Sequence, residues 1–181
     1  MSTVKQLVTA EELLKSFKDE FKTKVTNTRI ESITRGKEKT TITYVWMTID
    51  NSVYKKAVKH LFTFDEYPHF AVSSGYDKDK TIDIIHHFSL FHGERGRELS
   101  LNMTVSLPKS KPEIETITDL IPGALIAEQE KQEMLGIKVK GIPKDKRAFI
   151  SHDFPKGVYP WRKDEKGPGK MVRNLHEGDK L

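Results

Sequence analysis

The sequence contains no cysteine, and this absence excludes several kinds of chemistry. Without thiols the chain cannot form disulfides, thiolate zinc sites or cysteine-ligated iron–sulfur clusters. It also lacks any apolar run close to the roughly 20 residues that a membrane-spanning helix needs. The first twenty residues are charged and helix-patterned, unlike a signal peptide. We therefore expect a protein kept in the cytoplasm that carries no electrons itself and meets a membrane only through partners.

Glycine-rich phosphate-binding motifs are missing as well. Neither GxxxxGK[ST] nor GxGxxG occurs, and residues 166–170, Lys-Gly-Pro-Gly-Lys, lack the preceding strand and following helix of a phosphate loop. The net charge is +5, but 31 basic and 26 acidic residues are interspersed along most of the chain. Such a charge does not by itself assign a nucleic-acid partner.

At 181 residues the chain is long enough for one domain with a core, followed by an arm. Thr9 and Glu12 have the spacing of a capping box, and the apolar residues that follow share one helical face, which predicts a helix over 10–22. A cluster of capping residues at 50–52 predicts a second helix, which carries Val53, Ala57, Val58, Leu61 and Phe62.

Five segments have the composition or the alternation of strands. They are residues 28–35, 40–49, 69–74, 81–92 and 97–107. The first two are expected to form a hairpin across residues 36–38. This order of elements predicts an α+β fold, a mainly antiparallel sheet with helices on one face, followed by a further helix and an extended C-terminal arm.

Pro108 and Pro112 are expected to close the domain, which we place at residues 1–110. Residues 111–136 would then form a linker and an acidic helix over 122–135, with Gly136 as its C-terminal cap. Residues 137–181 would form a partner-binding arm. Its last seventeen residues are either disordered or held by a neighbour.

The acidic helix carries Glu128, Glu130 and Glu133, which invite a metal or acid–base interpretation. At about 100 degrees per residue, Glu130 and Glu133 share a face while Glu128 points away from them. At most two of the three carboxylates converge on one ion. We favour a solvated or partner-facing helix surface over an intrinsic site.

Histidines offer two further candidates. His86 and His92 share one side of their predicted strand but lie about 20 Å apart at strand rise, too far for one metal, and His87 faces the other side. A mixture of exposed and cross-strand histidines is expected. His152 and Asp153 resemble a catalytic pair, but no nucleophile motif accompanies them, so we interpret them as an interface contact.

The arm combines basic residues and aromatic residues without periodicity. Residues 138–150 hold five basic residues and one acidic residue, and the apolar Phe149, Ile150, Phe154, Tyr159 and Trp161 follow among frequent prolines and glycines. A structureless segment this apolar usually lies on another surface. Contact with single-stranded RNA is one interpretation. We favour an arm that runs over an acidic partner subunit.

Residues 122–164 carry a resemblance to a known family. The order Glu-x-Glu, two residues, Glu-Met-Leu-Gly-Ile, a basic linker, Asp-Phe-Pro, Gly-Val-Tyr-Pro and Arg-Lys-Asp resembles the thirty-kilodalton-type (C) subunit of complex I and its counterpart in membrane-bound energy-converting nickel–iron hydrogenases. The chain departs from the family in having Gln129 in place of an arginine. Over residues 1–110 the resemblance is only topological.

The resemblance implies an accessory subunit without its own cofactor or catalytic site. It would brace the large subunit, while nickel–iron and iron–sulfur centres reside in partner subunits on the cytoplasmic face of the membrane. Ile142 and residues 146–149 favour the hydrogenase, which would reduce protons with a donor such as ferredoxin and move ions, over a quinone- or sulfur-reducing relative. The expected interface residues are Glu128, Glu130, Glu133, Gly136, Arg147, Asp153, Phe154, Pro155, Gly157, Tyr159, Pro160, Trp161, Arg162, Lys163 and Asp164.

Two interpretations from other classes remain open. The chain is a free-standing basic RNA-binding module if its arm contacts nucleic acid. It is an enzyme if the carboxylates of the acidic helix perform acid–base chemistry.

Overall fold

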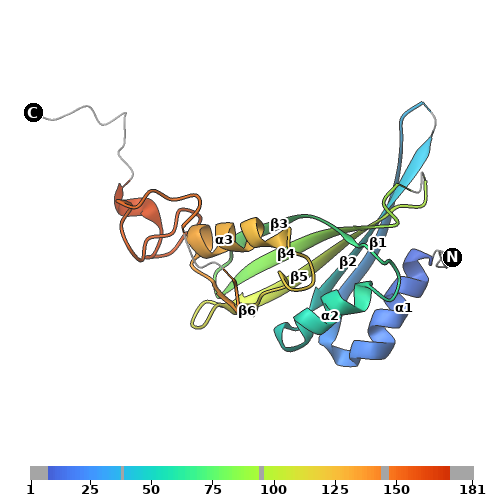
Figure 1. The fold of residues 1–181 in the computed structure, drawn as a ribbon, viewed down its shortest axis with the longest axis horizontal. Coiled ribbons are helices and arrows are strands. Elements are labelled where there is room, and N and C mark those ends of the chain that lie inside the picture. Colours follow the sequence, from blue (N-terminus) through green and yellow to red (C-terminus); the bar gives the residue numbers. More distant parts are fainter. Residues whose placement is uncertain (1–7, 38, 94–95, 144–146, 172–181) are drawn as a thin grey trace, which may run out of the picture.

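A computed structural model describes residues 8–37, 39–93, 96–143 and 147–171. Its main feature is a five-stranded sheet with the order β1-β2-β5-β4-β3, in which only the β2–β5 pair is parallel (Figure 1). The strands are β1 (Val25–Arg35), β2 (Thr40–Ile49), β3 (His69–Asp77), β4 (Thr81–Leu90) and β5 (Leu99–Pro108). The mainly antiparallel α+β fold predicted from the sequence is confirmed.

The first two helices cover one face of the sheet. Helix α1 (Ala10–Phe21) begins at the capping box that the sequence predicts, because the Thr9 hydroxyl accepts a hydrogen bond from the Glu12 amide and the Glu12 carboxylate accepts one from the Thr9 amide. A short 3-10 helix, η1 (Lys22–Lys24), leads into β1, and another, η2 (Asn51–Val53), leads into α2 (Tyr54–Leu61).

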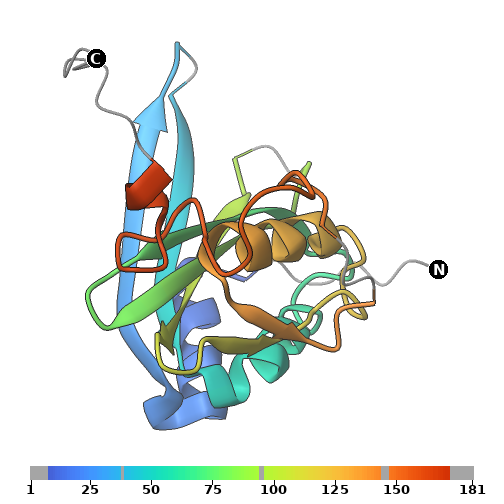
Figure 2. The same ribbon diagram turned by 90° about the vertical axis from the view of Figure 1, so that its left-hand side faces the viewer.

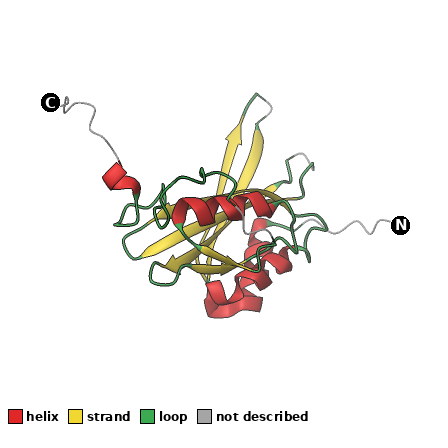
Figure 3. Cartoon of the chain, turned by 60° about the vertical axis from the view of Figure 1, so that its left-hand side comes forward, coloured by secondary structure: helices red, strands yellow, loops and turns green. Residues whose placement is uncertain are grey.

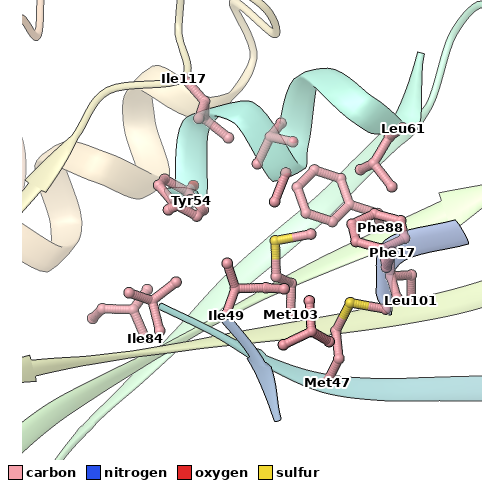
Figure 4. Packing of buried hydrophobic residues seen from close by; sticks show 14 of the residues in the cluster. Phe17, Met47, Ile49, Tyr54, Leu61, Ile84, Phe88, Leu101, Met103 and Ile117 are labelled. Carbon is pink, nitrogen blue, oxygen red and sulfur yellow. The ribbon is translucent and has the colours of Figure 1, made fainter. Parts of the chain in front are cut away.

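The hydrophobic core lies between these helices and the sheet (Figure 4). Alternate residues of β4 and β5 are fully buried on this face, for example Ile84 beside Val105, and Phe17 of α1 and Leu61 of α2 pack against them. Burying a side chain of this size contributes about 1.5 to 3 kcal/mol. The period-two pattern of β5 therefore reflects the burial of alternate side chains in the core, as the sequence predicts.

The β1–β2 hairpin extends beyond the body of the molecule (Figure 1). Strand β1 starts at Val25, three residues before the predicted start, because a bulge between Thr26 and Arg29 allows pairing to continue to Ile49. Asn27 lies in this bulge with φ 47°. Glu38, at the predicted turn, lies outside the described residues.

The segment after β5 contains structure that the sequence analysis missed. Strand β6 (Glu113–Glu115) pairs in parallel with β7 (Lys138–Lys140), and these two three-residue strands flank helix α3 (Ala124–Leu135). The helix begins two residues after Pro122, later than predicted, whereas Gly136 caps its end in the left-handed conformation, as predicted.

Helix α3 lies over β3, on the same face of the sheet as α2. The bulky side chain of Leu135 and the stem of Lys131 approach Gly75 of β3 so closely that a Cβ at Gly75 would lie 2.7 Å from Leu135 Cδ1. Beyond α3, residues 147–171 form loops and one short 3-10 helix, η3 (Pro168–Met171), beside the C-terminal end of α3 (Figures 2 and 3).

None of the described helices is both long enough and apolar enough to cross a lipid bilayer.

Candidate partner-binding surface

The three glutamates of α3 have three different environments. Glu128 is buried and binds the chain within the domain: its carboxylate accepts hydrogen bonds from the Thr116 hydroxyl at 2.6 Å and the Ile117 amide at 2.8 Å. Burial raises the pKa of this carboxyl, although both hydrogen bonds oppose the change. The expectation that Glu128 lies on the helix surface is therefore wrong, because the side chain is buried and its carboxylate holds residues 116–117.

Glu130 is partly exposed and forms an ion pair with its neighbour Lys131. The aliphatic stem of Lys131 is buried under the helix, and its ammonium group lies 5.1 Å from the centroid of the Trp161 ring. This cation–π contact connects α3 to the arm. Trp161 nevertheless keeps 40% of its surface exposed.

Glu133 organises the first part of the described arm. Its carboxylate accepts hydrogen bonds from three consecutive amides, those of Ala148, Phe149 and Ile150, at 2.5, 2.9 and 2.7 Å. Burial alone would raise the pKa of this carboxyl, but the three amide donors together hold it below its usual value. The Glu133 carboxylate therefore holds residues 148–150 of the arm against the end of α3.

The ring of Tyr159 packs directly on Gly136. A Cβ at position 136 would lie 2.6 Å from both Cδ2 and Cζ of that ring, and Gly136 also has φ 69°. Glycine satisfies both requirements, since it has no Cβ and adopts positive φ without strain. Two positions that the sequence analysis placed at the interface thus contact each other within the chain.

Arg162 enters a cluster of buried charges at the edge of the sheet. Its Nε lies 3.6 Å from Oδ2 of Asp77 in β3, and Asp77 also pairs with Lys109 at 2.5 Å. Asp164 completes the cluster: it forms an ion pair with the Arg162 guanidinium and lies 3.4 Å from Lys109. Hydrogen bonds from Arg162 lower the pKa of Asp164 to about 2, although partial burial opposes this change.

This cluster changes the interpretation of residues 162–164. The resemblance implied that they contact a partner, but Arg162 is buried and its charge is used within the chain. The amide of Lys163 also donates to Asp77 at 2.8 Å, while the Lys163 side chain is exposed. Sequence reasoning missed Asp77 and Lys109, because ion pairs between residues of distant elements leave no signal in the spacing of one sequence.

The other expected interface residues lie on or near the molecular surface. Arg147 is exposed and its guanidinium donates to the carbonyl oxygens of Ser151 and Phe154 at 2.9 and 3.4 Å. Asp153, Pro155 and Gly157 are exposed, while Phe154 and Pro160 are partly buried. The described arm therefore has a fixed backbone and an outer face that includes apolar side chains.

An open groove lies between the end of α3, β7 and the arm. It has a volume of about 420 Å³. The residues that line it are Gln132, Glu133, Ile137, Lys138, Arg147, Ile150, Lys156, Gly157, Val158 and Tyr159. Lys144 and Lys146, which the sequence analysis counted in the basic linker, lie outside the described residues.

The histidines do not form a metal site in the described part of the chain, where no three histidine, aspartate or glutamate side chains converge. His86 is buried beneath α2, with its ring stacked on Tyr54 at 4.9 Å between centroids, and it also contacts the ring of Phe70 on the neighbouring strand β3, so it is a buried cross-strand residue. His87, on the opposite face, hydrogen bonds with Asn102 and Ser74. His92 stacks on His69.

A known protein family matches most of the chain, including the surface described above. The family described as respiratory-chain NADH dehydrogenase, 30 Kd subunit, matches residues 47–171. This chain belongs to that family. The match runs from the last three residues of β2 to η3 and so includes strands β3, β4 and β5 and the described arm. The family assignment made from residues 122–164 is confirmed.

Individual relatives of this 30 Kd-subunit family member are subunits of a hydrogenase and of a dehydrogenase. The chain is 35% identical over 131 residues to membrane-bound hydrogenase subunit beta of Pyrococcus furiosus, covering 72% of this chain and 75% of the relative. It is 27% identical over 130 residues to a subunit of the F(420)H(2) dehydrogenase of Methanosarcina mazei, covering 70% of this chain and 79% of the relative.

A solved structure shares the fold over most of the chain. It is a chain of the membrane-bound sulfane sulfur reductase, an archaeal respiratory membrane complex, with a TM-score of 0.65, 15% identity and 94% coverage of both chains. At this identity the likeness shows the fold alone.

Proposed function

We propose that this protein is an accessory subunit of a complex I-type membrane oxidoreductase, in which α3 and the arm brace the large catalytic subunit. The observation that carries the proposal is the anchoring of the arm. Glu133 and Arg162 fix its backbone from two sides, yet Phe149 and Trp161 remain 45% and 40% exposed. Ordering an exposed aromatic surface before binding reduces the entropic cost of association.

Among the possible complexes we propose a membrane-bound energy-converting hydrogenase. It would reduce protons with electrons from a low-potential donor such as ferredoxin and couple this reaction to ion movement. The relative with 35% identity, a hydrogenase subunit, supports this choice over a quinone- or sulfur-reducing complex. The protein would lie on the cytoplasmic face of the membrane and reach it only through its partners.

The redox centres of such a complex would belong to other subunits. An iron–sulfur cluster requires cysteine thiolates in nearly all proteins, and this sequence contains none. Its residues therefore do not fit such a group, and we assign the chain a positional role. Its apolar side chains would fill pockets on the large subunit, and its charges would fix the register.

Purification of the native complex tests this function. The protein is tagged at its N-terminus in its own host, the membranes are solubilised in mild detergent, and the copurifying subunits, nickel and iron are measured. We expect a large membrane complex with both nickel and iron. Iron without nickel would contradict the hydrogenase and favour the quinone- or sulfur-reducing alternative. A metal-free protein without partners would contradict the proposed role itself.

A further inference from the structure

The groove beside α3 has an apolar floor and a cationic rim. Ile137 and Tyr159 form part of the floor, and Lys138, Arg147 and Lys156 lie around it. All three cationic side chains are exposed. A groove with this composition offers a hydrophobic contact and several positive charges to the same ligand.

The groove lining carries a net positive charge, because Lys138, Arg147 and Lys156 outnumber its one carboxylate, Glu133. The Glu133 carboxylate accepts hydrogen bonds from three amides of the arm, which hold it in the wall of the groove. Lys138 lies 4.0 Å from Glu113, a weak and exposed contact. Clustered charges of one sign in a cleft raise the local concentration of ligands of the opposite sign.

We propose that this groove binds an acidic segment of a partner subunit, with an apolar side chain on the floor and aspartate or glutamate side chains against Lys138, Arg147 and Lys156. The inference rests on the proposed function and adds the chemistry of the contact. The volume of about 420 Å³ accommodates several residues of an extended peptide, and the apolar floor adds a contact that a free inorganic anion would not use.

A polypeptide suits the groove better than RNA does. Recognition of a single strand depends on exposed aromatic faces on which bases stack. The one aromatic ring in the lining, Tyr159, packs against Gly136 and is only partly exposed. The walls are also held by hydrogen bonds between Glu133 and the arm, so a partner segment meets a groove that is already formed.

Zero-length coupling in the purified complex tests the contact directly. A carbodiimide joins lysine amines to carboxylates that are in contact, and the products are mapped by mass spectrometry. We expect Lys138 and Lys156 to couple to one common aspartate- or glutamate-rich segment of a partner subunit. Coupling of both lysines only within this chain, or to unrelated segments, would overturn the proposal.

Charge reversal gives an independent test. The double variant Lys138→Glu with Lys156→Glu is compared with Lys18→Glu with Lys59→Glu, which changes the same charge at exposed sites on α1 and α2. Both should melt like the wild type, since all four side chains are exposed. We expect the first variant to be retained in the complex at least tenfold less than the second, with a steeper loss on added salt.

The outcomes separate this inference from the proposed function. A complex that forms with the wild-type chain and retains both double variants equally would overturn the groove assignment alone. A wild-type chain that copurifies with no partner would overturn the proposed function. Retention that depends on RNA, and disappears on nuclease treatment, would show that the groove has a different class of ligand.

Discussion

The guanidinium of Arg162 lies 3.6 Å from the carboxylate of Asp77, and both side chains are buried. These residues are 85 positions apart, one in the irregular arm and the other on strand β3. Their contact makes the arm part of the folded protein before any partner binds. It follows that the arm binds a partner as a preformed surface, not as a disordered chain that folds on binding.

Removal of the Asp77 charge should release this end of the arm. In Asp77→Asn, Asp164 is the ion-pair partner that Arg162 and Lys109 keep among the described residues, and breaking such a buried pair typically costs about 3 kcal/mol of unfolding free energy. Urea unfolding measures the loss. Glu31→Gln is the control, since Glu31 pairs with Arg29 on the surface and should cost less than about 1 kcal/mol. Equal effects of the two substitutions would contradict the assigned role of Asp77.

Two glycines with similar positive φ angles separate the effect of a steric contact from that of backbone strain. Gly136→Ala places a methyl group against the Tyr159 ring at φ 69°, whereas Gly157→Ala at φ 81° meets nothing within 4 Å. Both should lose about 1 to 2 kcal/mol of unfolding free energy, because alanine is strained at positive φ. Only Gly136→Ala should lose more and expose the arm to protease. Proteolysis and thermal unfolding of the pair measure this, and identical behaviour would show that the Tyr159 contact is unimportant.

The Glu133 carboxylate should control the order of residues 148–150. In Glu133→Gln one oxygen remains as a neutral acceptor and the other is replaced by an NH2 group that cannot accept, so at least one of the three amide hydrogen bonds is lost, at a cost of about 1.5 to 3 kcal/mol. Hydrogen exchange of the amides of Ala148, Phe149 and Ile150 should become at least tenfold faster. Glu11→Gln, on the exposed side of α1, should leave them unchanged. Unchanged exchange in Glu133→Gln would contradict the role of the carboxylate.

The lowered pKa of the same carboxyl predicts that the order of residues 148–150 depends on pH. Because its pKa is lowered in the folded state, Glu133 contributes stability that is present above the unfolded pKa of about 4.3 and is lost as pH falls through the folded value. The protection of the three amides, measured as their exchange rate relative to an unstructured chain at the same pH, should therefore fall in acid in the wild type. In Glu133→Gln the protection should be low already.

His86 predicts a second, separate pH effect. Burial, with smaller effects of His87 and Lys131, lowers the pKa of His86 to about 3, whereas the unfolded value is about 6.5. Between these values only the unfolded chain binds the proton, so the unfolding free energy falls as pH is lowered, by up to about 1.4 kcal/mol per pH unit.

The substitution His86→Phe isolates this effect. Both ring nitrogens of His86 lack a hydrogen-bond partner among the described residues, so phenylalanine keeps the stacking on Tyr54 and loses only the titration. The loss of stability between pH 7 and pH 5 should be smaller in the variant. His60, whose pKa is also lowered by burial, and Glu128, whose raised pKa acts in the opposite direction, are present in both proteins. Identical pH profiles would contradict a neutral, buried His86.

Most of the fold could be predicted because its signals are local. The capping box at Thr9 and Glu12, the alternation in β5 and the C-terminal cap at Gly136 each depend on neighbouring residues, and the structure contains all three. Strands β6 and β7 gave no such signal, since three residues show no periodicity. The division of the chain at residue 110 stays a prediction.

The interface residues were harder to interpret, because their roles depend on distant partners. The sequence shows that Glu128 points away from Glu130 and Glu133 but does not show that the Thr116 hydroxyl lies beside it. Likewise, the charges of Arg162 and Asp164 have the pattern of surface residues in the sequence, and only the structure places Asp77 and Lys109 beside them. Part of the family pattern in residues 122–164 therefore consists of residues that make contacts within this chain.

Trp161 offers the most direct test of the claim that the arm holds this protein in its complex. Trp161→Ala removes the exposed ring but leaves the Arg162 cluster, and Tyr67→Ala removes a ring that is 77% exposed on the loop between α2 and β3. The measurement is the ratio of this protein to the large catalytic subunit in the detergent-solubilised complex. We predict that Trp161→Ala weakens binding by at least about 30-fold, the effect of a 2 kcal/mol hot spot, while the domain of residues 1–110 stays folded and Tyr67→Ala behaves like the wild type. Full occupancy by Trp161→Ala, or loss of the fold of residues 1–110 without loss of binding, would contradict the account.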